Sequence, residues 1–350
     1  MANAAQPLLS ALLAAALFGA ATPLSKPLLS ELSPPQLAGL LYLGAAMGVL
    51  PAVLWGTDAR DTWQVPRKSV LRLAGAIAFG GVLGPVFLLL GLRLASATLV
   101  SLWLNMEVVA TAVLGHLLFH DRLGLAGWLG AVGTLAAGVF LSAAEGDAGF
   151  AAALLVTLAC LCWGFDNHLT ALIDGMSPAR ATLWKGSIAG VVNLLIGANV
   201  QPFSASLRTA GLALLLGAFS YGASIVLYMT AAQRLGATRA HLLFATAPLA
   251  GVALAVGLLG ESLSTGHLAA AVILGVSLLL VFRSQHTHRH AHQALTHMHA
   301  HRHHDDHHDD HHAGEIVTVA HSHWHDHEPV VHPHLHWPDL HHRHLHSPEA

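Results

Sequence analysis

The stretch "RLASATLVSLWLNMEVVATAVLGHLLFHDRL", residues 93–123, returns in related form as "RLGATRAHLLFATAPLAGVALAVGLLGESL", residues 234–263. Both copies are mainly apolar, and each is long enough to cross a bilayer, which needs about 20 such residues. A single-residue gap aligns them at both ends, where the matching residues are Arg93-Leu94 with Arg234-Leu235, Ala97-Thr98 with Ala237-Thr238, and Asp121 with Glu261. The sequence therefore predicts a membrane-spanning unit that occurs twice.

Composition separates an apolar body from a polar tail. Of the 350 residues 54% are hydrophobic and only 10% are charged, with a mean hydropathy of +0.57, whereas soluble domains carry about 25% charged residues. Twenty-four of the 29 histidines follow Arg283. This contrast predicts an integral membrane protein with a His-rich C-terminal tail.

Polar and Pro/Gly clusters divide the body into ten apolar segments. Each is close to the length of a transmembrane helix, and together they predict an all-α fold of ten spans. The expected spans are 7–25, 35–55, 71–92, 96–119, 123–142, 149–172, 178–198, 208–233, 237–259 and 265–282. The first of them lacks the basic start of a signal peptide and is interpreted as a retained span.

Basic residues between the spans predict the orientation. The even-numbered connections hold eight Lys or Arg residues, and the odd-numbered ones hold at most three, Lys26, Arg93 and Arg208. The positive-inside rule then places the even connections and both termini on the cytoplasmic side of the membrane, which is expected to be a bacterial-type inner membrane. Since each repeat has an odd number of spans, the two repeats, 1–142 and 143–282, have opposite topology, which is typical of secondary transporters.

Several short motifs resemble the EamA-type family of the drug/metabolite transporter superfamily. The first span carries an aromatic-Gly pair followed by a lysine, Phe18-Gly19 and Lys26, and the sixth span repeats the pair as Trp163-Gly164 but has Ala171 at the lysine position. The family's Glu-Pro motif in the fourth and ninth spans is split here into Glu107-Val108 and Ala247-Pro248. Its exit motif reads "HDRL" at 120–123 and "GESL" at 260–263.

The resemblance covers residues 7–282 and implies a ten-helix carrier of small organic solutes. Known members of the family carry amino acids, nucleosides, sugars, amines and drugs, so the resemblance names no particular substrate. The resemblance names a family, while the inverted repeat is indicated by the residues themselves.

Polar side chains inside the spans are the candidates for a substrate or coupling-ion pathway. A charge at mid-span costs about 2.5–3.5 kcal/mol, so such residues face a cavity or a partner. Glu107 can bind a proton or a cation, and Lys185 can pair with Glu107 or Asp166 or reach the membrane surface. The full set of candidates is Lys26, Asn105, Glu107, Trp163, Asp166, Asn167, His168 and Lys185.

Other function classes find little support in the sequence. No Walker-type phosphate loop, HExxH motif or nucleic-acid signature is present, and no catalytic constellation predicts an enzyme. The energy for transport is therefore expected to come from a gradient, and a proton gradient is the first expectation. The expected partners are membrane lipid and a small-molecule substrate, while the Gly-xxx-Gly pairs are compatible with internal packing or with a homodimer.

The tail, residues 283–350, alternates His with other residues and lacks the apolar content of a core, which predicts disorder. No cofactor is expected to be required, but imidazole binds Zn, Ni and Co, so these ions are expected to bind loosely and exchangeably. The candidate ligands are His301, His303, His304, His307, His308, His311, His312, His321, His323 and His325.

Two alternatives to an organic-solute transporter stay open on the sequence. The tail could feed a divalent-metal exporter, or the protein could be a membrane-anchored metal buffer or sensor. The body contains only five histidines and no His-x3-Asp or Asp-x3-Asp pair within a span, which favours the organic-solute carrier.

Overall fold

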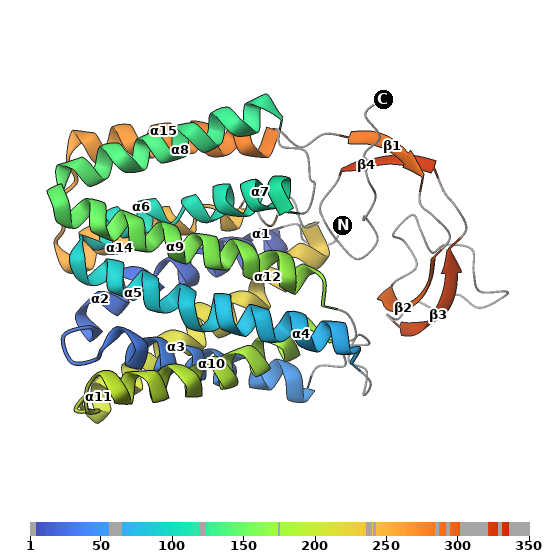
Figure 1. The fold of residues 1–350 in the computed structure, drawn as a ribbon, viewed down its shortest axis with the longest axis horizontal. Coiled ribbons are helices and arrows are strands. Elements are labelled where there is room, and N and C mark those ends of the chain that lie inside the picture. The colour runs from blue at the N-terminus through green and yellow to red at the C-terminus, as the bar shows by residue number, and fades with distance from the viewer. Residues whose placement is uncertain are drawn as a thin grey trace.

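A computed structural model gives the structure of the chain, and Figure 1 shows its fold. The residues that it describes are 5–55, 65–118, 124–173, 176–235, 240, 243–283, 287–291, 295–301, 321–327 and 331–335. Side chains are described from residue 6 to residue 281, apart from 232–239 and the other gaps between these ranges.

In the described part of the chain, eight helical segments are long and apolar enough to cross a membrane. They are α1–α2 (Ala5–Gly19, Ala21–Leu28), α3 (Pro34–Trp55), α4–η1–α5 (Arg67–Ala76, Ile77–Leu83, Gly84–Leu94), α6–α7 (Ala97–Trp103, Met106–Leu118), α8 (Leu125–Ala144), α9 (Gly146–Ala171), α10 (Pro178–Val200) and α11–η2–α12 (Leu207–Gly217, Ala218–Ala223, Ser224–Leu235). Two further apolar helices, α14 (Ala247–Leu259) and α15 (Thr265–Arg283), lie where the ninth and tenth spans were expected. The multi-pass α-helical fold is thus confirmed, and within the described residues eight of its ten expected spans have full spanning length.

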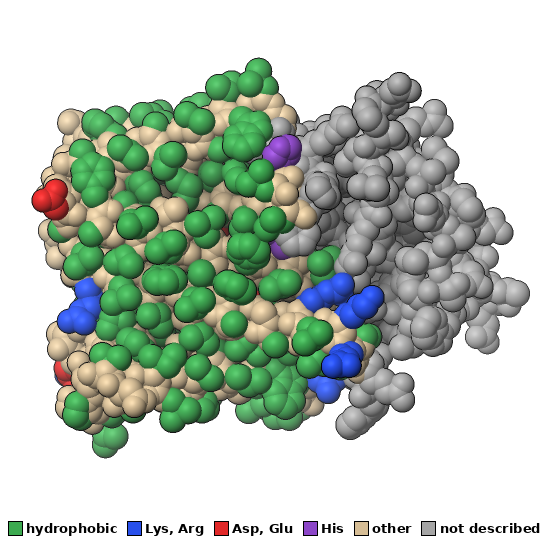
Figure 2. Space-filling model, viewed as in Figure 1, with side chains coloured by type: hydrophobic (Ala, Val, Ile, Leu, Met, Phe, Trp, Pro, Cys, Tyr) green, Lys and Arg blue, Asp and Glu red, His purple; other side chains and the backbone are tan. Residues whose placement is uncertain are grey.

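The helices lie side by side in one bundle (Figure 1). Helix α3 packs along α10, α11 and η2, while α15 packs on α8 and α5 on α9. Apolar side chains cover the visible flank of the bundle, and basic side chains gather at the end where α4 begins (Figure 2). This distribution is that of a protein whose flank faces lipid.

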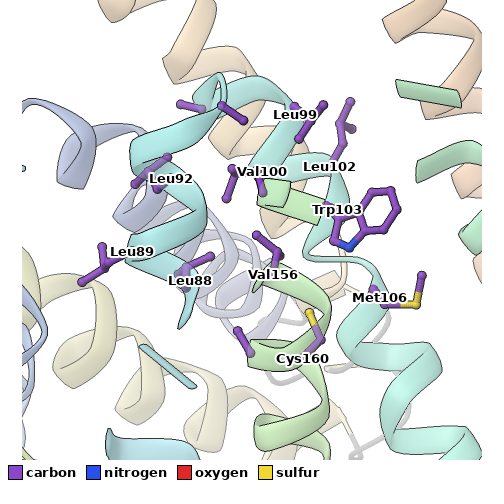
Figure 3. Packing of buried hydrophobic residues seen from close by; sticks show 14 of the residues in the cluster. Leu88, Leu89, Leu92, Leu99, Val100, Leu102, Trp103, Met106, Val156 and Cys160 are labelled. Carbon is purple, nitrogen blue, oxygen red and sulfur yellow. The ribbon is translucent and has the colours of Figure 1, made fainter. Parts of the chain in front are cut away.

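Small residues and Leu/Val side chains fill the interior. In the cluster drawn in Figure 3, Leu99 and Val100 of α6 meet Leu88 of α5 and Val156 of α9, and each is at most 3% exposed. Because the helices are already surrounded by lipid, this burial adds little hydrophobic stabilisation to their association. Close van der Waals packing stabilises the helix contacts instead.

The irregular segments of the two repeats coincide. The π-helices η1 and η2 begin at Ile77 and Ala218, which are 141 positions apart, as are Arg93 and Arg234. The fourth span is interrupted at Leu104-Asn105, and a turn at Ala245-Thr246 separates the helical residues Leu243-Phe244 from α14, within one residue of the repeat register. Broken helices in corresponding places are the pattern of inverted-repeat transporters.

The described backbone of the tail differs from the expected disorder. Strand β1 (Thr287–Ala291) pairs with β4 (Val331–Leu335), and β2 (Leu295–His301) pairs with β3 (His321–His327), both antiparallel. The alternation of His with other residues has a period of two, which suits an extended strand as well as a disordered chain. The composition alone does not separate the two.

Candidate transport site

A cavity lies where three interrupted helices meet. It borders the break between α1 and α2, the break between α6 and α7, and the turn that precedes α14. Its empty space, which includes the open side, is about 600 Å³. The lining residues are Phe18, Gly19, Thr22, Ser101, Leu104, Asn105, Glu107, Val108, Phe244, Ala245, Ala247 and Pro248.

The aromatic-Gly pairs bring the two repeats together around this cavity. A Cβ on Gly19 would lie 2.1 Å from the carbonyl oxygen of Ala247, so only Gly lets α1 approach the start of α14. In the other repeat, a Cβ on Gly164 would lie 2.9 Å from a Leu114 methyl and 3.2 Å from the Thr111 nitrogen of α7. In both cases a glycine of one repeat packs on a helix of the other repeat. Gly19 of the first repeat packs on α14, and Gly164 of the second repeat packs on α7.

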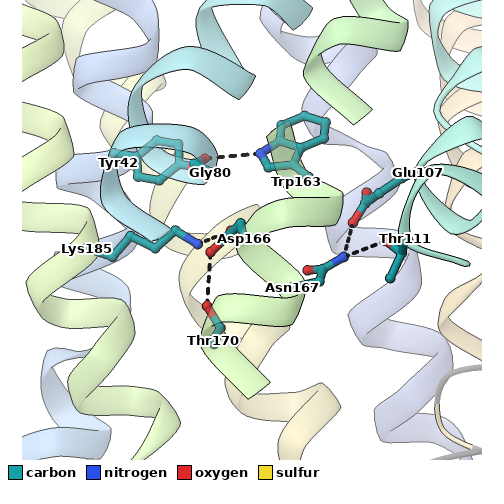
Figure 4. A network of polar contacts seen from close by, with 9 residues as sticks. All are labelled: Tyr42, Gly80, Glu107, Thr111, Trp163, Asp166, Asn167, Thr170 and Lys185. Carbon is teal, nitrogen blue, oxygen red and sulfur yellow. Dashed lines mark hydrogen bonds and ion pairs between the residues drawn. The ribbon is translucent and has the colours of Figure 1, made fainter. Parts of the chain in front are cut away.

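Glu107 is the one ionisable side chain of the described lining, and it lies in the first turn of α7. Its Oε1 accepts a hydrogen bond of 3.1 Å from Asn167 Nδ2, which also donates to Thr111 Oγ1 at 3.2 Å (Figure 4). The neighbouring His168 donates from Nε2 to the Thr111 carbonyl at 2.9 Å. Glu107 is therefore held by an amide, with no ion pair to any described residue.

Asp166 and Lys185 form an ion pair between α9 and α10, as Figure 4 shows. Asp166 is 6% exposed, and its Oδ1 also accepts from Thr170 Oγ1 at 2.9 Å. A Cβ on Gly80 of η1 would lie 2.0 Å from Asp166 Oδ2. The glycine is what allows the third span to lie against this pair.

The π-helix η1 presents carbonyls to side chains of other spans. Tyr42 and Trp163 both donate to the Gly80 carbonyl, at 2.5 and 3.1 Å, and Asn193 donates to the Gly81 carbonyl at 2.9 Å. A π turn interrupts the regular hydrogen-bond ladder of a helix, and these three donors pair with two of its carbonyls. Irregular backbone at membrane depth is tolerated where it is paired in this way.

The structure separates the predicted site residues into three groups. Glu107 and Asn105 line the cavity, and Asn167 and His168 lie beside Glu107, although the Asn105 amide itself donates to the Leu102 carbonyl at 2.8 Å. Asp166, Lys185 and Trp163 belong to the polar contacts around η1. Lys26 lies at neither place, because its Nζ donates to the carbonyls of Leu92 and Ala95 at the end of α5.

Sequence reasoning missed several residues of the site. Ser101 lines the cavity, is 1% exposed, and its hydroxyl has no hydrogen-bond partner among the described residues. Thr22 and Phe244 also line it, while Thr111 and Tyr42 hold the surrounding network. No sequence signal marks a single Ser or Thr inside an apolar span, since these residues pack there as readily as they bind.

A carboxylate joins the repeats at the opposite end of the bundle from α4. Glu261 accepts hydrogen bonds of 2.8 Å from the backbone N–H groups of Ala97 and Thr98, the first residues of α6. Burial raises the pKa of Glu261, but the bonds from Thr98 and Ala97 and the nearby Lys26 charge outweigh it, and the net pKa is lowered. The contact ties the loop after α14 to the broken fourth span.

Replacing Glu261 by Gln is expected to lower the stability of the protein by about 1 kcal/mol, the value of a helix N-cap. Because the pKa is lower in the folded protein, this contribution is present at neutral pH and is lost as the pH falls through the lowered pKa, below 4.5. Thermal unfolding in detergent at pH 7 and pH 4 measures both effects. An equal melting temperature for the two proteins at pH 7 would contradict this role.

The metal predictions concern mainly the tail. Among the residues described in the body, no group of three or more His, Cys, Asp or Glu side chains could hold a metal ion. His303, His304, His307, His308, His311 and His312 lie outside the described residues, and for His301, His321, His323 and His325 only the backbone is described. Metal binding by the tail stays a prediction, as does a homodimer.

A helical bundle with inverted repeats, paired broken spans and a cavity between them defines a membrane transporter as the class of protein. The model of the EamA-like transporter family matches residues 6–143 and again residues 150–283. The chain therefore belongs to the EamA-like transporter family, as its motifs indicated.

Two individual proteins are similar to this chain. An "Uncharacterized transporter" of Methanothermobacter thermautotrophicus (strain ATCC 29096 / DSM 1053 / JCM 10044 / NBRC 100330 / Delta H) is 28% identical over 302 residues, which cover 77% of this chain and 85% of that protein. One solved crystal structure aligns over 79% of this chain and 97% of its own, with a TM-score of 0.56 and 17% identity. The latter similarity shows the shared fold.

Proposed function

We propose that this membrane protein is a proton-coupled secondary transporter of small organic solutes that works by alternating access of its two repeats. The observation that carries the proposal is the cavity at three broken helices with Glu107 in its wall. Broken spans in inverted repeats place substrate and coupling-ion sites between the repeats. Residues of both repeats line this cavity, so relative movement of the repeats would change its access.

Glu107 is the residue assigned to coupling. A charged, unpaired carboxylate inside a membrane cavity has a high free-energy cost. Binding of either a proton or another cation lowers this cost, so the carboxylate can exchange one for the other. Asp166 is less suited to this role because Lys185 already balances its charge. The end of the bundle where α4 begins carries basic side chains. We assign this end and both termini to the cytoplasmic side of the cell membrane.

Reconstitution of the full chain in lipid vesicles with an internal pH dye tests this function. Amines, amino acids, nucleosides and sugars are added in turn, and at least one solute is expected to change the internal pH in protein-containing vesicles only. Zn, Ni and Co are run in parallel with the full chain and with a truncation that ends at Arg283. A pH response to metals alone, reduced by the truncation, would favour the metal-exporter alternative instead.

A further inference from the structure

Among the described residues, the negative charge of Glu107 in the cavity has no positive partner. Within the described structure, Glu107 is the only charged side chain of its lining, and helices α1, α6, α8 and α14 contain no charged residue at all. The two lysines of the described bundle interior are engaged elsewhere, Lys185 with Asp166 and Lys26 with backbone carbonyls of α5. Since no described side chain supplies a positive charge to Glu107, a ligand or a proton can supply it.

The position of Glu107 favours its ionised form when a cation is present. It lies in the first turn of α7, where the positive end of the helix dipole stabilises a negative charge. The groups that face it are the Asn167 amide, His168 and Asp166 on α9, Lys185 on α10 behind Asp166, and Tyr221 on η2. None of them supplies a direct ion pair to the carboxylate.

The same cavity offers little to a ligand carboxylate. The helix that starts at its wall, α14, has Pro248 in its first turn, which has no N–H group. The N–H groups of Leu249 and Ala250 already bond to the Thr246 carbonyl, at 3.0 and 3.4 Å. The start of α14 is therefore not an anion site, although a helix of this length ordinarily could be.

The remaining lining fits an apolar, aromatic body next to the charge. The rings of Phe18 and Phe244 lie 5.1 Å apart between centroids, and Leu104, Val108 and Pro248 complete an apolar wall. Aromatic faces also attract cations. The unpartnered, buried Ser101 hydroxyl can accept a hydrogen bond from an ammonium group, which has three N–H donors to place.

We propose that the cavity binds a monovalent organic cation, a protonated amine on an apolar or aromatic body, with the ammonium on Glu107 and Ser101 and the body against the rings of Phe18 and Phe244. This inference rests on the proposed function and names its substrate class. A proton and the amine neutralise the same carboxylate, so only one of them is bound at a time. Exchange of one for the other moves no net charge across the membrane.

Four probes with one aromatic body and different head groups test the proposal. Purified full-length protein in lipid nanodiscs is titrated at pH 7.5 with 2-phenylethylamine, 2-phenylethanol, 3-phenylpropionate and phenylalanine, and binding is followed by calorimetry. The amine is expected to bind at least about tenfold more tightly than the other three, since a charge-assisted hydrogen bond contributes about 1.5–3 kcal/mol. Its affinity is expected to fall as the pH is lowered and protons compete for Glu107.

Variants assign the binding to the cavity. Glu107→Gln is expected to remove the preference for the amine, Glu107→Asp to keep part of it, and Asp147→Asn, which changes an exposed acid at the start of α9, to leave it intact. Equal or tighter binding of the alcohol, the acid or phenylalanine would overturn the proposal, as would undiminished amine binding by a folded Glu107→Gln protein.

The vesicle assay separates this proposal from the function on which it rests. If an anionic or neutral solute moves protons in a Glu107-dependent way, the substrate class is wrong and the coupled transporter stands. If the amine binds through Glu107 but no solute changes the internal pH, the proton coupling is wrong and the binding site stands.

Discussion

Glu107→Gln is expected to abolish solute-driven proton movement, with a loss of at least about 100-fold in initial rate. The amide keeps the shape of the side chain and can still bond to Asn167, but it can neither release a proton nor neutralise a cation. Since the described lining contains no second ionisable group, nothing there replaces the lost carboxylate. Initial rates of pH change in vesicles, measured with the solute that gives the largest wild-type signal, provide the test.

The matched control for this experiment is Asp147→Asn, which removes an equal charge from an exposed position. Its rate is expected to stay within a factor of two of the wild type. A Glu107→Gln protein that keeps a wild-type melting temperature and also a wild-type rate would show that coupling lies elsewhere. Asp166 would then be the next residue to test.

Gly80→Ala is expected to lower the stability of the bundle by about 3–5 kcal/mol, the cost of breaking a buried ion pair. The new methyl group would lie 2.0 Å from Asp166 Oδ2 and 2.6 Å from Asp166 Cβ, so α9 would have to move away from η1. That movement would pull Asp166 from Lys185 and the Trp163 N–H from the Gly80 carbonyl. Unfolding of the purified protein by denaturant in mixed micelles measures the loss.

Gly211→Ala is the control for the glycine substitution. A Cβ at Gly211 in α11 meets no atom within 4 Å, and alanine is the better helix former by up to about 1 kcal/mol. Its stability is therefore expected to equal or slightly exceed that of the wild type. A Gly80→Ala protein as stable as Gly211→Ala would mean that η1 does not constrain Asp166.

The repeat and the apolar segments made most of the fold predictable. The separation between Arg93 and Arg234 also gives the spacing of the two π-helices, but nothing in "IAFGGVL" marks a π-helix before its partners are known. The turn at Ala245-Thr246, directly before α14, is likewise not marked in the sequence, because the expected span from 237 to 259 is mainly apolar around it. Helix breaks inside such segments depend on tertiary contacts, here on the approach of Gly19 to Ala247.

The charged residues inside the spans were the part of the site that the sequence could predict. A charge inside a span is expensive, so Glu107, Asp166 and Lys185 stood out, and the pairing of Lys185 with Asp166 was one of the alternatives. Lys26 shows the limit of this reasoning. Its position one turn from the end of a span fits a pathway lysine equally well, and only the carbonyls of Leu92 and Ala95 reveal that it caps a helix.

The wide turn in the third span also shifts the phase of that helix. An α-helix advances about 100° per residue, and a π turn accommodates an extra residue, so α4 presents a face about 100° away from the one that continuous winding from α5 would give. Deleting one residue between Ile77 and Leu83 would straighten the span but rotate every side chain of α4 about its axis. Length variation at this point is therefore a rotational change, and its counterpart in the second repeat begins at Ala218.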